Sequence, residues 1–112
     1  MVVTAYQERV YTLLTQIPKG KVASYASLSA ALRSSPRAVG GALRRNPFAP
    51  EVPCHRVIQA NGSIGGFKGE PQDAPSGVNR KMKLELLKSE GVEFDELGTL
   101  LDNRKWWNDF LV

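Results

Sequence analysis

Cysteine and histidine are almost missing from this chain of 112 residues, which contains one of each, Cys54 and His55. A single cysteine cannot form an internal disulfide, and it is typical of proteins in a reducing, intracellular compartment. One thiol and one imidazole are also too few for a metal cluster, so we expect no metal and no cofactor.

Long hydrophobic runs are missing too. The longest apolar stretches span only a few residues, too few to cross a bilayer, so we expect no membrane association. The N-terminus lacks a basic start followed by an apolar stretch, so no secretory signal is visible. At this length we expect a single domain, residues 1–112, with one modest core.

Acidic residues are absent between Glu8 and Glu51. The same stretch contains seven basic residues: Arg9, Lys19, Lys21, Arg33, Arg37, Arg44 and Arg45. Residues 69–112 are, by contrast, net acidic. A basic half of this kind favours a polyanionic partner, although a solvated basic surface would give the same pattern.

Capping residues predict helices in the first half of the chain. Thr4 followed by Gln7 is a capping-box pattern at the start of an amphipathic helix over residues 5–17. Ser24 begins a second, short helix at about residues 25–32. A third helix follows after about three residues, so this region resembles a helix-turn-helix.

The predicted third helix, residues 36–45, has almost no large side chains in its middle. Gly40 and Gly41 each cost roughly 1 kcal/mol relative to alanine there. The glycines indicate either close packing against another protein element or close approach of the helix backbone to a ligand, with Arg37 as the one long side chain near its start. For a DNA ligand, a smooth helix suits the narrow minor groove.

The second half predicts a buried strand, turns, one helix and an aromatic tail. A strand at 52–59 is followed by a type I′ hairpin turn at Asn61-Gly62 and a glycine-rich loop at 62–69. A helix then runs from about 79 to 90, and a small hairpin pairs 92–94 with 99–101. Trp106, Trp107 and Phe110 form a cap that seals the core. The fold class predicted is therefore mostly α with a small β-hairpin.

Cys54 and His55 are the only adjacent pair of nucleophile and base in the chain. A small buried cysteine beside a hydrogen-bonded histidine is the structural alternative. Arg56 follows directly, and a positive environment is expected around a reactive thiol. In a strand, adjacent side chains point to opposite faces, so His55 would act through a water or after a bend at Pro53.

Five segments resemble, in order and spacing, the catalytic domain of the O6-alkylguanine-DNA alkyltransferases: SYASLSAAL, RAVGGALRRNP, PCHRVI, NGSIGGFKG and KLELLKSEG. The resemblance covers about residues 4–91. It implies a winged-helix-like domain that contains a helix-turn-helix at about residues 25–45, an active-site strand at 52–58 and a loop at 62–69. It also implies direct transfer of the alkyl group from O6-alkylguanine to Cys54, which consumes the protein.

The resemblance also implies site residues. Cys54 would be the alkyl acceptor, His55 its base through a water, Glu90 the distal partner of His55, Asn46 the residue that holds the turn, and Tyr25 a donor toward the guanine. The DNA-binding residues would be Tyr25, Ser35, Arg37, Ala38, Gly40, Gly41 and Arg44. The base pocket would contain Cys54, Val57, Ile64, Gly65, Phe67 and Lys68.

The implied partner is double-stranded DNA containing O6-alkylguanine, bound at the minor groove with the damaged base flipped out, because a base inside the duplex is unreachable. Arg37 would fill the vacated stack, and the carbonyls of Cys54 and Val57 would accept the amine of the guanine. We expect a monomer in solution, in the nucleus if the source is eukaryotic.

The sequence departs from the family at several points. Most members carry an N-terminal α/β domain, where any zinc is bound, and we expect this chain to lack both. Phe67 stands where relatives often have tyrosine, Lys68 replaces a small polar residue, and residues 70–78 form an insertion. The Trp-rich tail is similar to that of the alkyltransferase-like proteins.

Two alternatives to catalysis stay open. One is a non-enzymatic lesion-binding protein, similar to the alkyltransferase-like proteins, which flags the damage for another repair pathway. Those proteins usually carry another residue, commonly tryptophan, at the position of Cys54. The other is a plain helix-turn-helix domain, which leaves Cys54 and His55 unexplained. Retention of PCHR together with Glu90 favours catalysis.

Overall fold

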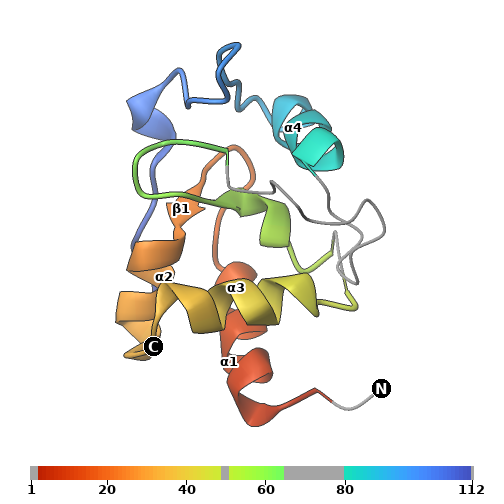
Figure 1. Cartoon of the computed structure of the whole chain (residues 1–112), viewed down its shortest axis with the longest axis vertical. Coiled ribbons are helices and arrows are strands. Elements are labelled where there is room, and N and C mark those ends of the chain that lie inside the picture. Colours follow the sequence, from red (N-terminus) through yellow and green to blue (C-terminus); the bar gives the residue numbers. More distant parts are fainter. Residues whose placement is uncertain (1–2, 49–50, 65–79, 112) are drawn as a thin grey trace.

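The computed structural model describes residues 3–48, 51–64 and 80–111. Its elements, in chain order, are α1 (Ala5–Leu14), β1 (Ala23–Ser24), α2 (Tyr25–Leu32), α3 (Pro36–Arg44), the 3-10 turn η1 (Cys54–Arg56), β2 (Val57–Ile58), α4 (Arg80–Ser89) and the 3-10 turn η2 (Asn103–Lys105). In Figure 1, α3 crosses the front of the molecule, α1 lies toward the bottom of the molecule and α4 toward the top. The predicted mostly-α fold class is confirmed.

The caps of α1 and α2 are those that the sequence predicts, and α3 is capped in the same way. Thr4 and Gln7 form the capping box of α1, and Ser24 accepts a hydrogen bond from the amide of Ser27 at the start of α2. Ser35 accepts one from the amide of Ala38, and proline takes the first position of α3. These bonds satisfy amide groups that have no partner within the helix.

The predicted extension of the first helix to residue 17 is wrong. α1 ends at Leu14, and the amides of Gln16 and Ile17 bond to carbonyls only three residues earlier. Pro18 explains the change, because the residue before a proline is disfavoured in the α conformation. Ile17 is still buried in the core.

The predicted strand at 52–59 is also wrong in its first half. Cys54–Arg56 form a 3-10 turn, in which the amide of Val57 bonds to the carbonyl of Cys54. Only Val57–Ile58 are extended, and they pair in parallel with Ala23–Ser24. The small sheet therefore joins segments far apart in the sequence and is not a hairpin.

The turn after β2 differs from the predicted type. A type I′ turn needs a positive φ at both central residues, but only Gly62 has one, at 89°. The amide of Gly62 bonds to the carbonyl of Gln59, and Ser63 then bridges to Thr99 rather than to β2. The second predicted hairpin is confirmed by the antiparallel bridge between Phe94 and Leu100.

Two hydrophobic clusters lie on either side of the η1–β2 segment. The first gathers α1, α2 and α3 with Cys54 and Val57. The second contains Val22, Ile58, Ile64, Leu87, Val92 and Leu100. The segment that carries the single cysteine therefore runs between two packed regions, which restrict its movement.

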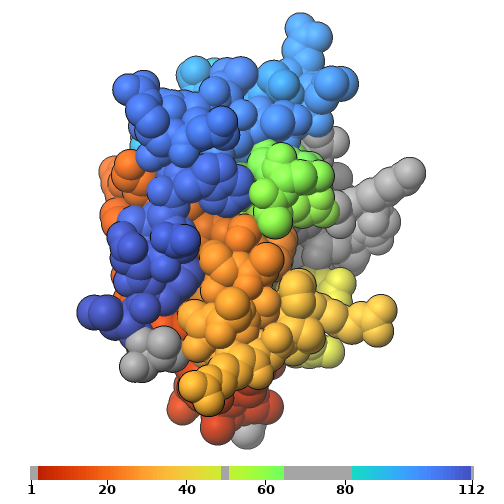
Figure 2. Space-filling view, turned by 90° about the vertical axis from the view of Figure 1, so that its left-hand side faces the viewer, coloured from red at the N-terminus to blue at the C-terminus, as the bar shows by residue number. Residues whose placement is uncertain are grey.

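The aromatic tail covers the core as predicted. The rings of Trp107 and Phe110 lie 4.9 Å apart in an edge-to-face arrangement and pack against the first cluster, and Trp106 packs against the second. Trp107 donates its amide to the carbonyl of Val22. Figure 2 shows the C-terminal segment along the side of the segment that holds β1 and α2. None of the helices described is long and apolar enough to span a bilayer.

Candidate active site

The 3-10 turn η1 changes the relation between Cys54 and His55. In a strand the two side chains would point to opposite faces, whereas a 3-10 turn of three residues per turn brings successive side chains closer to one side. Both residues are buried, with exposed fractions of 5% for Cys54 and 1% for His55. The bend that the sequence analysis requires for contact with His55 is therefore present, one residue after Pro53.

His55, Glu90 and Arg56 form one partly buried network. The Nε2 atom of His55 lies 3.0 Å from Oε2 of Glu90. Arg56 donates two hydrogen bonds to the same carboxylate, from Nε to Oε1 at 2.9 Å and from Nη2 to Oε2 at 2.8 Å. Its Nη1 donates to the carbonyl of Ile17 at 2.8 Å. The structure thus brings His55 and Glu90 together across 35 residues of sequence.

Burial and charge set the protonation of this network. Burial lowers the pKa of the His55 imidazole below its ordinary value of 6.5; Glu90 opposes this shift, while Arg56 and Lys83 add to it. Burial opposes ionisation of Glu90, but the hydrogen bonds from Arg56 and His55 outweigh it and keep its pKa below 4.5. Near neutral pH the imidazole is therefore neutral and the carboxylate ionised.

The tautomer of His55 follows from its partner. An ionised carboxylate can only accept hydrogen bonds, so Nε2 carries the ring proton and donates a hydrogen bond to Glu90. The other ring nitrogen, Nδ1, is buried and has no hydrogen-bond partner among the described residues. Nδ1 therefore keeps its lone pair and can take up a proton.

Asn46 connects α3 to the segment that leads to η1. It is fully buried, its Nδ2 donates to the carbonyl of Val52 at 2.9 Å, and its Oδ1 accepts from the amide of Phe48 at 2.9 Å. Replacing this side chain would leave buried backbone groups without partners. Its predicted role in the reaction stays a prediction.

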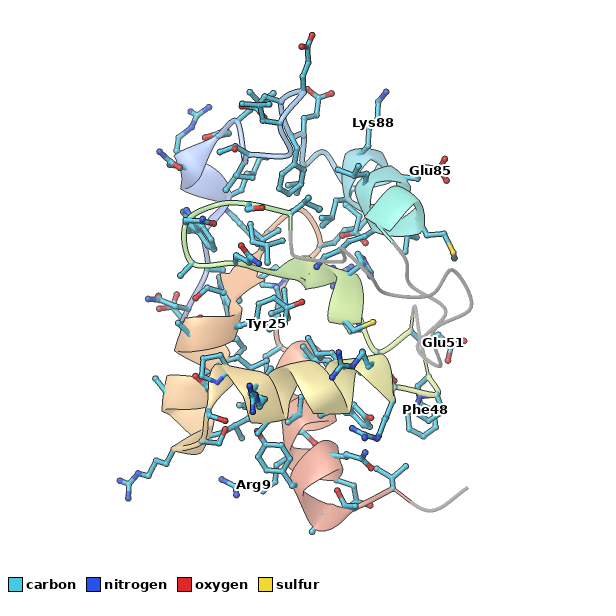
Figure 3. All side chains as sticks on the ribbon, in the orientation of Figure 1. Arg9, Tyr25, Phe48, Glu51, Glu85 and Lys88 are labelled. Atoms are coloured by element: carbon cyan, nitrogen blue, oxygen red, sulfur yellow. The ribbon has the colours of Figure 1, made fainter. Side chains whose placement is uncertain are left out.

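Tyr25 lies in the middle of the molecule, at the start of α2 and above α3 (Figure 3). Its ring packs against the first cluster, and Nζ of Lys83 lies 5.7 Å from the ring centre. Lys83 is 1% exposed, so a cation from α4 is buried beside both Tyr25 and the His55 network.

The outer surface of α3 is small and basic. Arg37, Ala38 and Arg44 are exposed, as is the cap Ser35. A Cβ atom added at Gly40 would meet nothing within 4 Å, and one at Gly41 would meet only the end of the Arg45 side chain, at 3.1 Å. Of the two interpretations of these glycines, packing against another described element is therefore excluded at Gly40.

The structure places part of the predicted base pocket. Val57 and Ile64 are buried on either side of the turn that follows β2. The carbonyl of Cys54 already accepts the amide of Val57, although a carbonyl has a second lone pair. Gly65, Phe67 and Lys68, predicted for the same pocket, lie outside the described residues.

Two residues of the site, Arg56 and Lys83, do not follow from the sequence motifs. The sequence indicates Arg56 only as a positive charge directly after the Cys54-His55 pair. No sequence pattern indicates Lys83, because a lysine on an amphipathic helix is ordinarily exposed. Among the described residues, no three His, Cys, Asp or Glu side chains gather as metal ligands would.

Residues 5–92 match the sequence model of a family described as 6-O-methylguanine DNA methyltransferase, DNA binding domain. The methylated-DNA–protein-cysteine methyltransferase of Thermococcus gammatolerans is 52% identical over 92 residues, 81% of this chain and 47% of that protein. A DNA base-flipping protein of Thermus thermophilus is 45% identical over 84 residues, 75% of this chain and 51% of that protein.

A solved structure is similar to this chain in its three-dimensional fold. S. pombe Atl1, crystallised with damaged DNA containing O6-carboxymethylguanine, is 26% identical, with a TM-score of 0.70 over 96% of this chain and 98% of that one. By contrast, the chain spans about half the length of the curated relatives it matches.

Proposed function

The chain belongs to the family of the 6-O-methylguanine DNA methyltransferase DNA-binding domain, and we propose that it transfers the alkyl group of O6-alkylguanine in duplex DNA to Cys54. The observation that carries this proposal is the His55–Glu90 hydrogen bond of 3.0 Å beside the single cysteine. A neutral imidazole, oriented by a carboxylate, is the arrangement that activates a neighbouring nucleophile.

The proposed reaction is a single displacement. The sulfur of Cys54 attacks the alkyl carbon, the new sulfur–carbon bond forms, and the bond from that carbon to O6 of the guanine breaks. Nδ1 of His55 takes the thiol proton through a water, and the guanine takes up one proton as it leaves, with Tyr25 donating toward its ring. The product is a thioether, whose carbon–sulfur bond is not opened by thiol exchange as a disulfide would be, so each molecule reacts once.

Entry of the base must occur from one side, because Cys54 is only 5% exposed. We propose that α3 lies in the minor groove, that Arg37 enters the stack, and that the damaged nucleotide rotates out of the duplex toward Cys54. The open space at Gly40 supports this contact, since it lets the helix backbone approach a groove closely. The protein would bind as a monomer.

Intact mass after incubation with an oligonucleotide duplex containing O6-methylguanine tests the proposal. We expect the protein to gain the mass of one methyl group in place of hydrogen, located on the peptide with Cys54. Cys54→Ser should show no gain while it still binds the lesion. A wild-type protein that binds the lesion and keeps its mass after long incubation would refute alkyl transfer.

The same experiment covers a second candidate, lesion binding without chemistry. The likeness to S. pombe Atl1 over almost the full length of both chains favours it. In that case the wild-type protein would bind O6-alkylguanine tightly and never change in mass. Equal affinity for damaged and undamaged duplex would instead favour a plain DNA-binding domain.

A further inference from the structure

Arg33 ends α2 in a backbone conformation that few side chains adopt. Its φ is 55° and its ψ 45°, in the left-handed region. It is the one non-glycine residue with a positive φ in the part of the chain that the structure describes. The other described positions with a positive φ are all glycine: Gly20, Gly62, Gly91 and Gly98. Because a Cβ atom is disfavoured in this region, glycine would be the more stable residue at position 33.

The end of α4 provides a comparison within the same chain. Both helices close with a Schellman motif, in which an amide bonds to the carbonyl five residues earlier. These bonds are 2.9 Å from Ser34 to Ser29 and 2.8 Å from Val92 to Leu87. The left-handed position of the motif is Arg33 at α2 and Gly91 at α4. The motif itself therefore does not call for an arginine.

No contact of the guanidinium with the described residues explains the arginine. Arg33 is exposed, and its side chain makes no hydrogen bond or ion pair with any described residue. It also lies in the stretch between Glu8 and Glu51 that contains no acidic residue. A charge that is kept in an unfavourable backbone conformation, with no partner among the residues that the structure describes, points to a partner outside the protein.

The position of Arg33 identifies that partner. Arg33 lies two residues before Ser35, the cap of α3. The turn is held in place, because the hydroxyl of Ser34 lies 2.7 Å from that of Tyr6 on α1. If α3 faces DNA as proposed, the backbone of the bound duplex passes close to the turn at the start of this helix, within reach of an exposed cation there.

We propose that Arg33 binds a phosphate of the DNA duplex on which α3 sits, and that this contact is the reason why an arginine, and not a glycine, occupies the left-handed position of the motif. The inference rests on the proposed function, because it requires α3 to face DNA. It adds a contact outside the set that the family resemblance implies. Arg33 would position the protein on the backbone and carry no information about the base sequence.

Three variants separate the effect of charge from the effect of backbone conformation. Arg33→Gly removes both the charge and the cost of a side chain in the left-handed conformation, whereas Arg33→Gln removes the charge alone. Lys88→Gln removes one charge from an exposed position on α4, far from α3 (Figure 3). We expect both Arg33 variants to bind duplex DNA several-fold more weakly, and the slope of log affinity against log salt to shrink by about 0.9, one phosphate contact. Lys88→Gln should bind as the wild type does.

Thermal unfolding of the same variants gives the second readout. Arg33→Gly should raise Tm by a few degrees, because the left-handed position no longer carries a Cβ atom, whereas Arg33→Gln should not. Gly91→Arg, the reverse change at the matching position of α4, should lower Tm by a similar amount. Beyond its chain neighbours, the added Cβ would meet no described atom within 4 Å, so a steric clash at the Cβ does not add to the cost of the conformation.

Two results would overturn the inference while leaving the proposed function intact. One is a wild-type salt slope and affinity in both Arg33 variants. The other is a lower Tm for Arg33→Gly, which would mean that the arginine serves the negative end of the α2 dipole. A wild-type protein that does not bind duplex DNA would overturn the proposed function, and the inference with it.

Discussion

Arg56 contacts three groups at once in the centre of the site. Its guanidinium bonds both oxygens of Glu90 and the carbonyl of Ile17. The Glu90 side chain is 9% exposed and that of Arg56 16%. This single side chain therefore ties the turn after α1 to the residue that follows α4 and keeps the carboxylate in place for His55.

Arg56→Ala should lower the free energy of unfolding by about 3 kcal/mol, because a buried carboxylate loses its charged partner. Arg56→Lys should recover only part of this loss, since an ammonium cannot bond both oxygens as the planar fork does. Urea unfolding measures both variants. Arg104→Ala, which breaks an exposed ion pair with Asp102, is the control and should change little. A similar loss in the control would contradict the assignment.

His55 should make the protein less stable as the pH falls below 6.5. Its pKa is lower in the folded protein than the ordinary value of 6.5, so the unfolded chain binds more protons in the interval between the two values. Stability then rises with pH across that interval and is lost as the pH falls through it. His55 is the only histidine, so His55→Gln should remove this slope. Urea unfolding at a series of pH values tests it, and a slope that persists in the variant would refute it.

At the scale of elements, α3 combines a poor helix sequence with an open surface. Gly40 has empty space where a side chain would begin. Gly40→Ala should therefore raise the free energy of unfolding by roughly 1 kcal/mol, while weakening duplex binding through the added methyl group. Thermal unfolding and a binding titration measure the two effects. A more stable variant with unchanged affinity would show that this surface does not contact DNA.

The elements that the sequence predicts well are those determined by neighbouring residues. Capping residues such as Thr4, Ser24 and Ser35 act within three positions, so their helices can be located from the sequence. η1 could not, because its turn and the short β2 depend on pairing with Ala23–Ser24, more than thirty positions away. The hydrophobic pattern of the segment is compatible with both a strand and this turn.

The same distinction applies to the site. Cys54, His55 and Glu90 come from motifs that resemble a family, and the structure adds the distance between the last two. The contacts of Arg56 and Lys83 follow from the folding of α4 against η1 and Tyr25, which no local pattern describes. Burial of a lysine in particular is decided by tertiary packing.

Charge is unevenly distributed over the surface of the whole molecule. The surface of α3 exposes Arg37 and Arg44, whereas the hairpin after α4 exposes Glu93, Asp95 and Glu96. A duplex would therefore be attracted to the α3 surface and repelled by the hairpin, which orients the protein before any specific contact forms. The orientation agrees with a phosphate contact at Arg33.

The C-terminal tail packs against the core of the molecule, and loss of its contacts should lower the stability of the whole fold. Trp107 packs against the first cluster and bonds to Val22, which precedes β1. We expect Trp107→Ala to lower the free energy of unfolding by about 2 kcal/mol, less than for a fully buried tryptophan because this ring is only partly buried. Leu111→Ala, at a side chain that is 82% exposed, should stay within about 0.5 kcal/mol of the wild type. Urea unfolding compares the two, and equal stability of both variants would mean that the tail rests on the core without stabilising it.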